Sequence, residues 1–444
     1  MAGRPNTFWR AFGPGLLFAG AAVGVSHLVQ STRAGAGYGL SLVLVVVAAN
    51  LLKFPAFRFG GQYAAATGRS LLEGYRLLGP WALWLFALLT LATMWTVAAA
   101  VTVVTAGLLG NLLGSILGGE AGGVGSPVAL SAALLALCGA LLAVGRFHWF
   151  DRVMKVVVVV LTLATVSAAA LIAPRIDWGA ARLLPDVATW TAKDVTFVAA
   201  LVGWMPSAID VAVWQSLWTL ARARDAGAER DAQGSEATAD RVREVLLDFD
   251  IGYLGTALLA LAFVLLGAGA LHGKGVVFAP SAGGFANQVI EMFAVALGGW
   301  ARPVIGVAAL TVMLSTTLTV ADGFPRAIAV LWQRLQGPEE SFSADVDGGQ
   351  ARRVYLGTFV VLASGSLVVI GKLMTSLADL VDLATTLSFL TAPLLAWMNH
   401  RVIHGDEVPL ACRPSTAMRA LSWLGQGFMF AFAAIYVWIR FGPT

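Results

Sequence analysis

Charge is what this sequence has least of, and its scarcity excludes most soluble folds. Only 12% of the 444 residues are Asp, Glu, Lys or Arg, about half the usual share for a soluble domain. Mean hydropathy is +0.79. One apolar stretch of about 20 residues follows another, and that is the length a helix needs to cross a bilayer. The composition therefore predicts an all-α polytopic membrane protein, with the lipid bilayer as its first partner.

Cysteine and histidine are also scarce, which excludes several kinds of site. The two cysteines, Cys138 and Cys412, fit neither a disulfide framework nor a zinc motif. The five histidines are scattered, and no nucleotide-binding loop or two-histidine metalloprotease motif is present. The net charge of +4 is not gathered into a basic stripe with interleaved aromatics. We therefore expect no enzyme, no bound cofactor and no nucleic-acid partner.

Eleven membrane spans are predicted from the apolar runs. The first run leads straight into further spans, so we interpret it as a retained helix rather than a cleaved signal peptide. Lys and Arg gather in the loops on one side, which predicts a cytoplasmic N-terminus and an external C-terminus in the cell membrane. The predicted spans are 11–34, 39–65, 80–110, 128–146, 152–174, 194–220, 245–270, 301–321, 353–371, 376–400 and 417–440.

The longer loops differ in character. Residues 221–245 mix both charge signs, which predicts a solvated helix, and residues 335–352 are polar and acidic, which predicts a mobile linker. Residues 284–299 predict an amphipathic surface helix before the eighth span.

Two of the spans are interrupted at corresponding places. The first contains Gly20 and Gly24 and then turns polar, and the sixth contains Gly203 followed by Met205 and Pro206. Glycines can simply allow close helix packing in a membrane. Interrupted spans in corresponding positions of two halves, however, are typical of the binding site of secondary transporters. Because both breaks fall in register, we favour the binding-site interpretation.

The two interrupted spans also divide the chain into repeats. Spans one to five and spans six to ten can be laid over each other, and an odd number of spans inverts the orientation. The pattern predicts a LeuT-type inverted 5+5 repeat with helices one and six broken. Repeat one is 11–174, repeat two is 194–400, the transporter core is 1–400, and residues 401–444 add an eleventh helix with its flanks.

Several motifs resemble those of the Nramp family of divalent metal-ion transporters. These are the Gly-Pro-Gly at 13–15, the broken first helix, the glycine-rich run 34–39, and Met205 with Pro206 in the sixth span. The resemblance covers spans one to ten in order and spacing. It implies a secondary transporter that moves a metal cation, manganese or iron, by alternating access.

The resemblance also assigns positions to the metal site. The family breaks its first helix at Asp-Pro-Gly-Asn, whose Asp and Asn bind the metal, and the matching residues here are Gly24, Val25, Ser26 and His27. In the sixth span the family uses a Met sulfur and a carbonyl three residues earlier. Those groups match Met205 and Val202, and Ser207 stands where the family has His.

Two further family features are a proton relay and an arginine pair. The family carries an Asp and a Glu in its third span, whereas the matching stretch 92–97 here contains no acid. The family begins its ninth span with two arginines, and Arg352 and Arg353 match them.

The chemistry of the matched residues is mixed. His27 offers an imidazole and Met205 a soft thioether, which suit a transition metal, together with the Val202 carbonyl. A buried His or Met also commonly serves only in packing. These neutral donors would hold a divalent ion without an anion, which is costly in a low dielectric. Asp210 lies five residues after Met205, about 7 Å along a helix, and could balance the charge without binding the ion.

One cation argues for a different substrate. Arg33 follows the first break, where it would repel a divalent metal, attract a carboxylate, or pair with an acid such as Asp210. The N-terminal ends of broken helices also favour anions. The alternative hypothesis is therefore the same fold carrying a small organic solute, zwitterionic or anionic. A non-transporting receptor is a third class, and no long soluble segment supports it.

The tenth span offers pathway candidates. Asp382 and Asp379 stand near its start, either at membrane depth or at a hydrated rim with Lys372 as a partner. The polar run 385–388 and Thr391 follow on the same helix. In the family the tenth span contributes to the ion pathway. The sequence leaves open the substrate, the coupling ion, the direction of flux and the oligomeric state.

Overall fold

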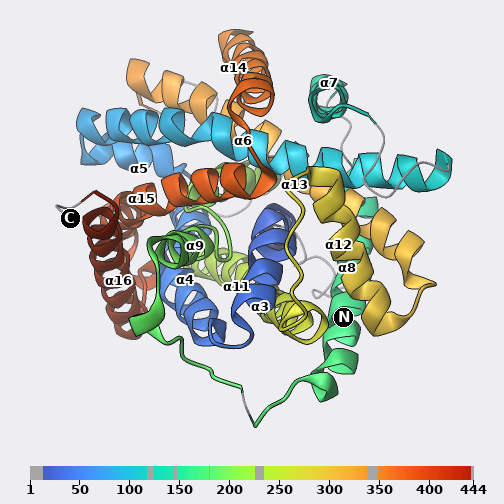
Figure 1. Cartoon of the computed structure of the whole chain (residues 1–444). Coiled ribbons are helices and arrows are strands. Elements are labelled where there is room, and N and C mark those ends of the chain that lie inside the picture. Colours follow the sequence, from blue (N-terminus) through green and yellow to red (C-terminus); the bar gives the residue numbers. More distant parts are fainter. Residues whose placement is uncertain are drawn as a thin grey trace, which may run out of the picture.

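Long apolar helices make up the chain wherever the computed structural model describes it, over residues 14–117, 125–144, 148–179, 181–225, 235–338 and 349–441. Within these ranges the regular secondary structure is entirely helical (Figure 1). The main helices are α2 (Pro14–Ala22), α3 (Thr32–Tyr38), α4 (Val43–Thr67), α5 (Leu71–Leu78), α6 (Pro80–Leu117), α7 (Pro127–Val144), α8 (His148–Ile172), α9 (Ala192–Gly203), α10 (Val211–Asp225), α11 (Ser235–Leu271), α12 (Ala282–Leu297), α13 (Ala301–Gln336), α14 (Gly349–Val368), α15 (Leu377–Ile403) and α16 (Thr416–Phe441).

Seven of the described helices are long and apolar enough to cross a membrane, namely α4, α6, α11, α13, α14 with its π-helical end, α15 and α16. The predicted spans coincide with these seven, with the shorter apolar helices α7 and α8, or with the broken pairs α2–α3 and α9–α10. The prediction of an all-helical polytopic membrane protein is confirmed.

Some helix ends lie beyond the predicted boundaries. Helix α13 continues through Pro325 to Gln336, although the sequence predicted an end at 321. Proline is tolerated there because neighbouring helices can satisfy the freed backbone groups. Helix α11 begins at Ser235, inside the stretch predicted as a solvated helix. The predicted mobile linker lies largely outside the described residues, and the predicted surface helix is observed as α12.

Both predicted helix breaks are present. Helix α2 ends at Ala22 and a π-helical turn, Ser26–Ser31, leads into α3. Helix α9 ends at Gly203, and residues 204–210 form a non-helical link to α10. Figure 1 shows α3, α9 and α11 in the middle of the view, with α16 at one edge. The breaks therefore lie in the interior, where non-helical backbone is tolerated only if it is buried in protein or lines a cavity.

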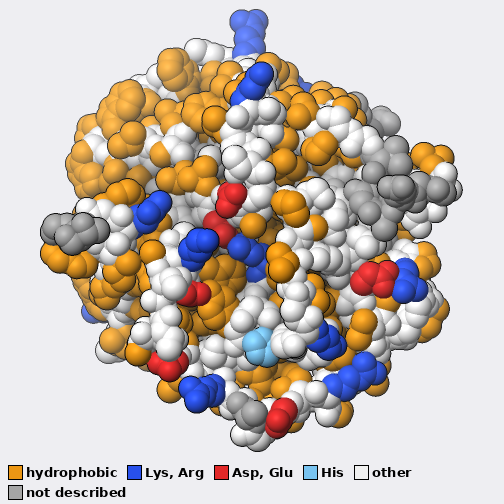
Figure 2. All heavy atoms as spheres, viewed as in Figure 1, with side chains coloured by type: hydrophobic (Ala, Val, Ile, Leu, Met, Phe, Trp, Pro, Cys, Tyr) orange, Lys and Arg blue, Asp and Glu red, His pale blue; other side chains and the backbone are white. Residues whose placement is uncertain are grey.

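Apolar side chains cover much of the molecular surface. On the face shown in Figure 2, Lys, Arg, Asp and Glu lie mainly near the centre and lower edge, and hydrophobic side chains dominate the upper and left periphery. Leu88 on α6, Leu163 on α8 and Trp438 on α16 are each more than 60% exposed. Such a surface requires a lipid environment, so this is a multi-pass membrane protein.

Close helix contact at Gly35 gives a stability prediction. A Cβ atom at Gly35 would lie 2.1 Å from the carbonyl oxygen of Val264 on α11, whereas one at Gly37 would meet nothing within 4 Å. We expect Gly35→Ala to destabilise the protein by about 1–3 kcal/mol, because backbone cannot yield as a side chain can. Gly37→Ala, two residues away on the same helix, is the matched control. Thermal unfolding in detergent measures the stability of both variants. Equal melting temperatures of the two variants would contradict the close contact of Gly35 with α11.

Candidate functional site

A threonine from α13 forms hydrogen bonds beside the break in helix one, the broken pair α2–α3. Thr316 Oγ1 lies 3.1 Å from the carbonyl oxygens of Gly20 and Val23, which are next to the break. A Cβ atom at Gly24 would lie only 2.8 Å from Thr316 Cγ2, so a residue without a side chain is needed here. The predicted site residue Gly24 is therefore where helix one approaches α13.

His27 points towards α11. Its Nε2 lies 2.9 Å from the carbonyl oxygen of Thr256, and its Nδ1 lies 2.8 Å from Ser26 Oγ. A carbonyl only accepts hydrogen bonds, so Nε2 donates. Ser26 Oγ also lies 2.7 Å from the Ala22 carbonyl oxygen. Both nitrogens of the predicted metal ligand are thus bound within the protein, and His27 is fully buried.

Met205 lies in a different environment from His27. It is fully buried and belongs to an apolar cluster with Val202, Phe389 of α15 and Tyr436 of α16. His27 instead faces the backbone of α11, so their side chains reach different partners. The breaks are neighbours in the fold, and the described contacts of these two predicted ligands are with different partners.

Lys53, which the sequence did not single out, lies at the same break as Val202. It lies on α4 and is 1% exposed. Its Nζ donates hydrogen bonds to the carbonyl oxygens of Val202 at 3.0 Å, Gly203 at 2.8 Å and Ser207 at 3.0 Å. The carbonyl predicted to bind a metal therefore binds a lysine. A basic residue within an apolar span was the signal, because charged groups at membrane depth are costly and usually functional.

An ion pair joins helix one to α15. Arg33 Nη1 and Nη2 donate to the two oxygens of Asp382 at 2.6 and 3.0 Å. The suggested pairing with Asp210 is therefore wrong. Gln30 accepts from Arg33 and donates to Asp382 and to Thr385 Oγ1. This arrangement places two predicted pathway residues, Arg33 and Asp382, directly beside the break.

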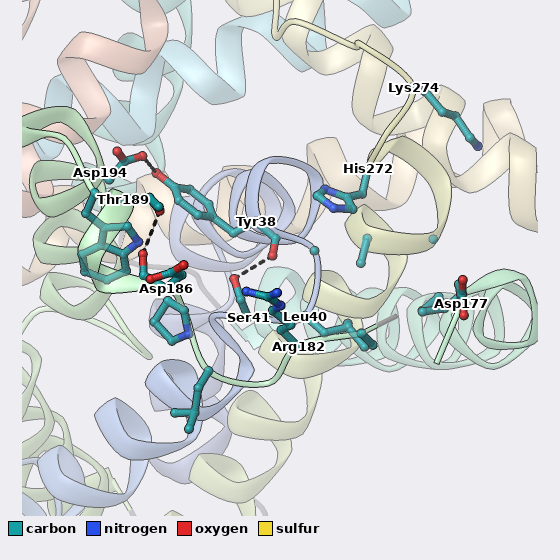
Figure 3. Close-up of a pocket in the computed structure, with 18 of the residues that line it drawn as sticks. Tyr38, Leu40, Ser41, Asp177, Arg182, Asp186, Thr189, Asp194, His272 and Lys274 are labelled. Atoms are coloured by element: carbon teal, nitrogen blue, oxygen red, sulfur yellow. Dashed lines mark hydrogen bonds between the residues drawn. The ribbon is translucent and has the colours of Figure 1, made fainter. Parts of the chain in front are cut away.

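A pocket of about 690 Å³ is lined by residues of the loops predicted to be external, among them Arg182 and Lys274 (Figure 3). Tyr38 lines it and donates a hydrogen bond of 2.6 Å to Asp194. The ring of Tyr38 stacks on the ring of Phe197, with 5.3 Å between the ring centroids. The guanidinium of Arg33 lies 4.9 Å from the centroid of the Phe197 ring. Contacts from Tyr38 through Phe197 and Arg33 to Asp382 therefore connect the lining of the pocket to the residues beside the first break.

The remaining predicted residues are dispersed. Asp210 is buried, and its Oδ2 accepts no hydrogen bond from the described part of the chain. Thr391 donates to the carbonyl of Ser388 on its own helix. Arg352 donates to the carbonyl of Ala143 at the end of α7, and Arg353 is exposed near the start of α14.

Asp379 does not pair with Lys372. Its carboxylate instead accepts hydrogen bonds from the hydroxyls of Thr375 and of Ser376, the N-cap residue of α15, and from no lysine among the described contacts.

Comparison with known proteins identifies a family and a relative that this chain matches. The family described as "Natural resistance-associated macrophage protein-like" (Nramp) matches residues 15–439. An uncharacterized protein of Pasteurella multocida (strain Pm70) is 31% identical over 431 residues, which are 96% of this chain and 92% of that one.

Two solved structures share the fold. The Eremococcus coleocola manganese transporter, in complex with an aromatic bis-isothiourea compound, is 14% identical with a TM-score of 0.63, covering 100% of this chain and 91% of that chain. MhsT in complex with L-phenylalanine is 16% identical with a TM-score of 0.64, covering 97% and 98%. The predicted LeuT-type fold is thereby confirmed. This chain belongs to the Nramp family and is a secondary transporter, not an enzyme.

Proposed function

We propose that this Nramp-family transporter carries a small non-metal organic solute, through a site between the breaks of helices one and six. The observation that supports this is the Lys53 ammonium on the carbonyl oxygen of Val202. That oxygen also lies 3.3 Å from the Met205 backbone N–H, which uses its second lone pair. The proposed site residues are Gly24, Ser26, His27, Val202, Met205, Ser207 and Asp210.

Electrostatics argue against a divalent ion beside this lysine. Two unit charges about 4 Å apart repel by about 4 kcal/mol at an effective dielectric constant of about 20, so a divalent ion would be opposed by on the order of 8 kcal/mol. Among the described contacts no carboxylate pairs with Lys53, whose ammonium meets three carbonyl oxygens. A neutral, zwitterionic or anionic solute avoids the repulsion.

Neutral polar side chains surround the breaks. Gln30 donates to Thr385 Oγ1 at 3.3 Å, and Trp204 Nε1 donates to Ser388 Oγ at 2.8 Å. Such groups orient organic ligands by hydrogen bonding. Arg33 would be available to a solute carboxylate only when its pair with Asp382 opens. Opening of that pair is therefore the step at which an anionic solute would be recognised.

A metal cation is the second candidate, because the E. coleocola manganese transporter shares this fold and Met205 lies at the break. Binding would require Lys53 to leave the Val202 carbonyl and His27 to turn away from Thr256. The proposed orientation has the N-terminus in the cytoplasm and the C-terminus outside.

Uptake by proteoliposomes separates the two candidates. We expect uptake of radioactive manganese, iron and cadmium to equal that of empty vesicles. A thermal-shift screen of amino acids, carboxylates and nucleobases should find a stabilising solute, since a ligand that binds only the folded state raises its stability. Metal uptake above empty vesicles that is lost in both His27→Ala and Met205→Ala would overturn the proposal.

A further inference from the structure

The three oxygen atoms that Lys53 contacts come from one short stretch of backbone. Val202 and Gly203 end α9, and Ser207 lies in the non-helical link that follows. The last four carbonyls of a helix have no partner within the helix, and the helix dipole places partial negative charge there. The break therefore creates a concentrated, electronegative set of acceptors in the protein interior.

The amine of Lys53 matches this set in number and distance. Its hydrogen bonds of 3.0, 2.8 and 3.0 Å have ordinary lengths for N–H···O contacts. An ammonium has three N–H donors, whereas a neutral amine has two, so the three acceptors fit the charged form. The ring of Phe57 lies 5.6 Å from Nζ, within the range of a cation–π contact.

No carboxylate balances this charge among the described contacts. Arg33 is paired with Asp382 and Arg58 with Asp250, whereas Lys53 forms no ion pair within the described ranges. A cluster of backbone carbonyls without an acid is the kind of site that replaces the hydration shell of a monovalent cation. We propose that the Lys53 ammonium is a tethered cation filling such a site, and that the emptied carbonyls would bind a free alkylammonium or alkali ion.

The proposal goes beyond the transported solute, because it concerns an ion that the protein supplies itself. It makes Lys53 the residue that decides the specificity of this site. With the lysine present, the carbonyls are closed to free cations. With the side chain shortened to alanine, the space it leaves should admit a small primary ammonium whose N–H groups reach the same three oxygens.

Chemical rescue of Lys53→Ala tests this. The full-length protein is purified in detergent, and melting temperatures are compared at constant ionic strength in tetramethylammonium, ethylammonium, potassium and sodium chloride. Tetramethylammonium has no N–H donor and is the reference. We expect K53A to melt roughly 5 °C or more below the wild type in the reference salt. Ethylammonium should recover at least half of that loss, and the wild type should not respond.

Two variants serve as controls. Lys53→Met removes the donors but keeps the side chain's volume, so it should be equally destabilised and not rescued. Lys274→Ala removes a lysine that donates to a single carbonyl, Ala270, at the end of α11, and should show no cation-specific change.

Three outcomes would overturn the proposal. Two of them are a K53A melting temperature equal to that of the wild type in tetramethylammonium and a loss that none of the three test cations restores. If folded K53A can be purified from membranes only when ethylammonium is present, the proposal is supported. If folded K53A cannot be purified in any of the four salts, the proposal is overturned. Because no transported solute is used, manganese uptake would overturn the proposed function without affecting this result.

Discussion

Replacing Arg33 with alanine is expected to open the site to the side predicted to be external and to speed chemical labelling there at least ten-fold. The Arg33–Asp382 pair is bidentate and largely shielded, with side chains 15% and 21% exposed. Removing one partner of a buried pair leaves the other charge uncompensated, at a cost of about 3–5 kcal/mol. That cost falls on the closed arrangement, in which α3 and α15 meet, and every 1.4 kcal/mol changes a population about ten-fold.

A cysteine at position 385 reports the change. Thr385 is fully buried and lies three residues after Asp382 on α15, one turn deeper on the same face. Thr385→Cys in intact cells is treated with a membrane-impermeant maleimide, with and without R33A. The two native cysteines are buried and provide the background.

Two controls distinguish a specific effect of the Arg33–Asp382 pair from a general loss of stability. Arg58 forms a similar bidentate pair with Asp250, between α4 and α11, so Arg58→Ala removes a comparable interaction elsewhere. It should not speed labelling. The exchange R33D/D382R restores opposite charges and should return labelling towards the slow rate. If R33A is labelled at the same rate as R58A, the Arg33–Asp382 pair does not control access to position 385.

The helix breaks were predictable because their cause is local. Gly24 and the Gly203–Pro206 stretch lower the helix propensity of their own segments, and apolar length fixes the spans on either side. The end of α13 was not predictable in this way. Pro325 ordinarily stops a helix, and only neighbouring helices allow it to continue to Gln336.

The contacts at the site were less predictable because they depend on distant residues. Arg33 and Asp382 lie 349 positions apart, and no sequence spacing links them. The sequence placed His27 at the break, yet its direction is decided by the carbonyl of Thr256 on α11. Lys53 was visible as a cation within an apolar span, but its acceptors exist only because helix six breaks opposite α4.

Replacing Asp322 with alanine should reduce transport at least ten-fold and lower the melting temperature. Asp322 on α13 accepts hydrogen bonds from Arg326 at 2.9 Å, from Tyr355 Oη on α14 at 2.8 Å and from Trp218 Nε1 on α10 at 3.1 Å. It therefore connects the second half of broken helix six to two helices of the surrounding bundle. Removing the acid takes the acceptor from the buried Tyr355 and Trp218 donors, and each buried donor left unsatisfied costs about 1–3 kcal/mol.

Two single substitutions separate movement from stability at this cluster. Trp218→Phe removes only the hydrogen bond from α10, and Tyr355→Phe removes only the one from α14. If α10 moves against α13 during alternating access, as broken helices do in this fold, the Trp218 bond forms in only some conformations. W218F should therefore speed labelling of a Gln215→Cys probe on α10 in inside-out vesicles about ten-fold, because a hydrogen bond to a charged acceptor contributes about 1.5–3 kcal/mol. Y355F should lower the melting temperature without this acceleration. Equal labelling of the two variants would mean that α10 and α13 stay together during transport.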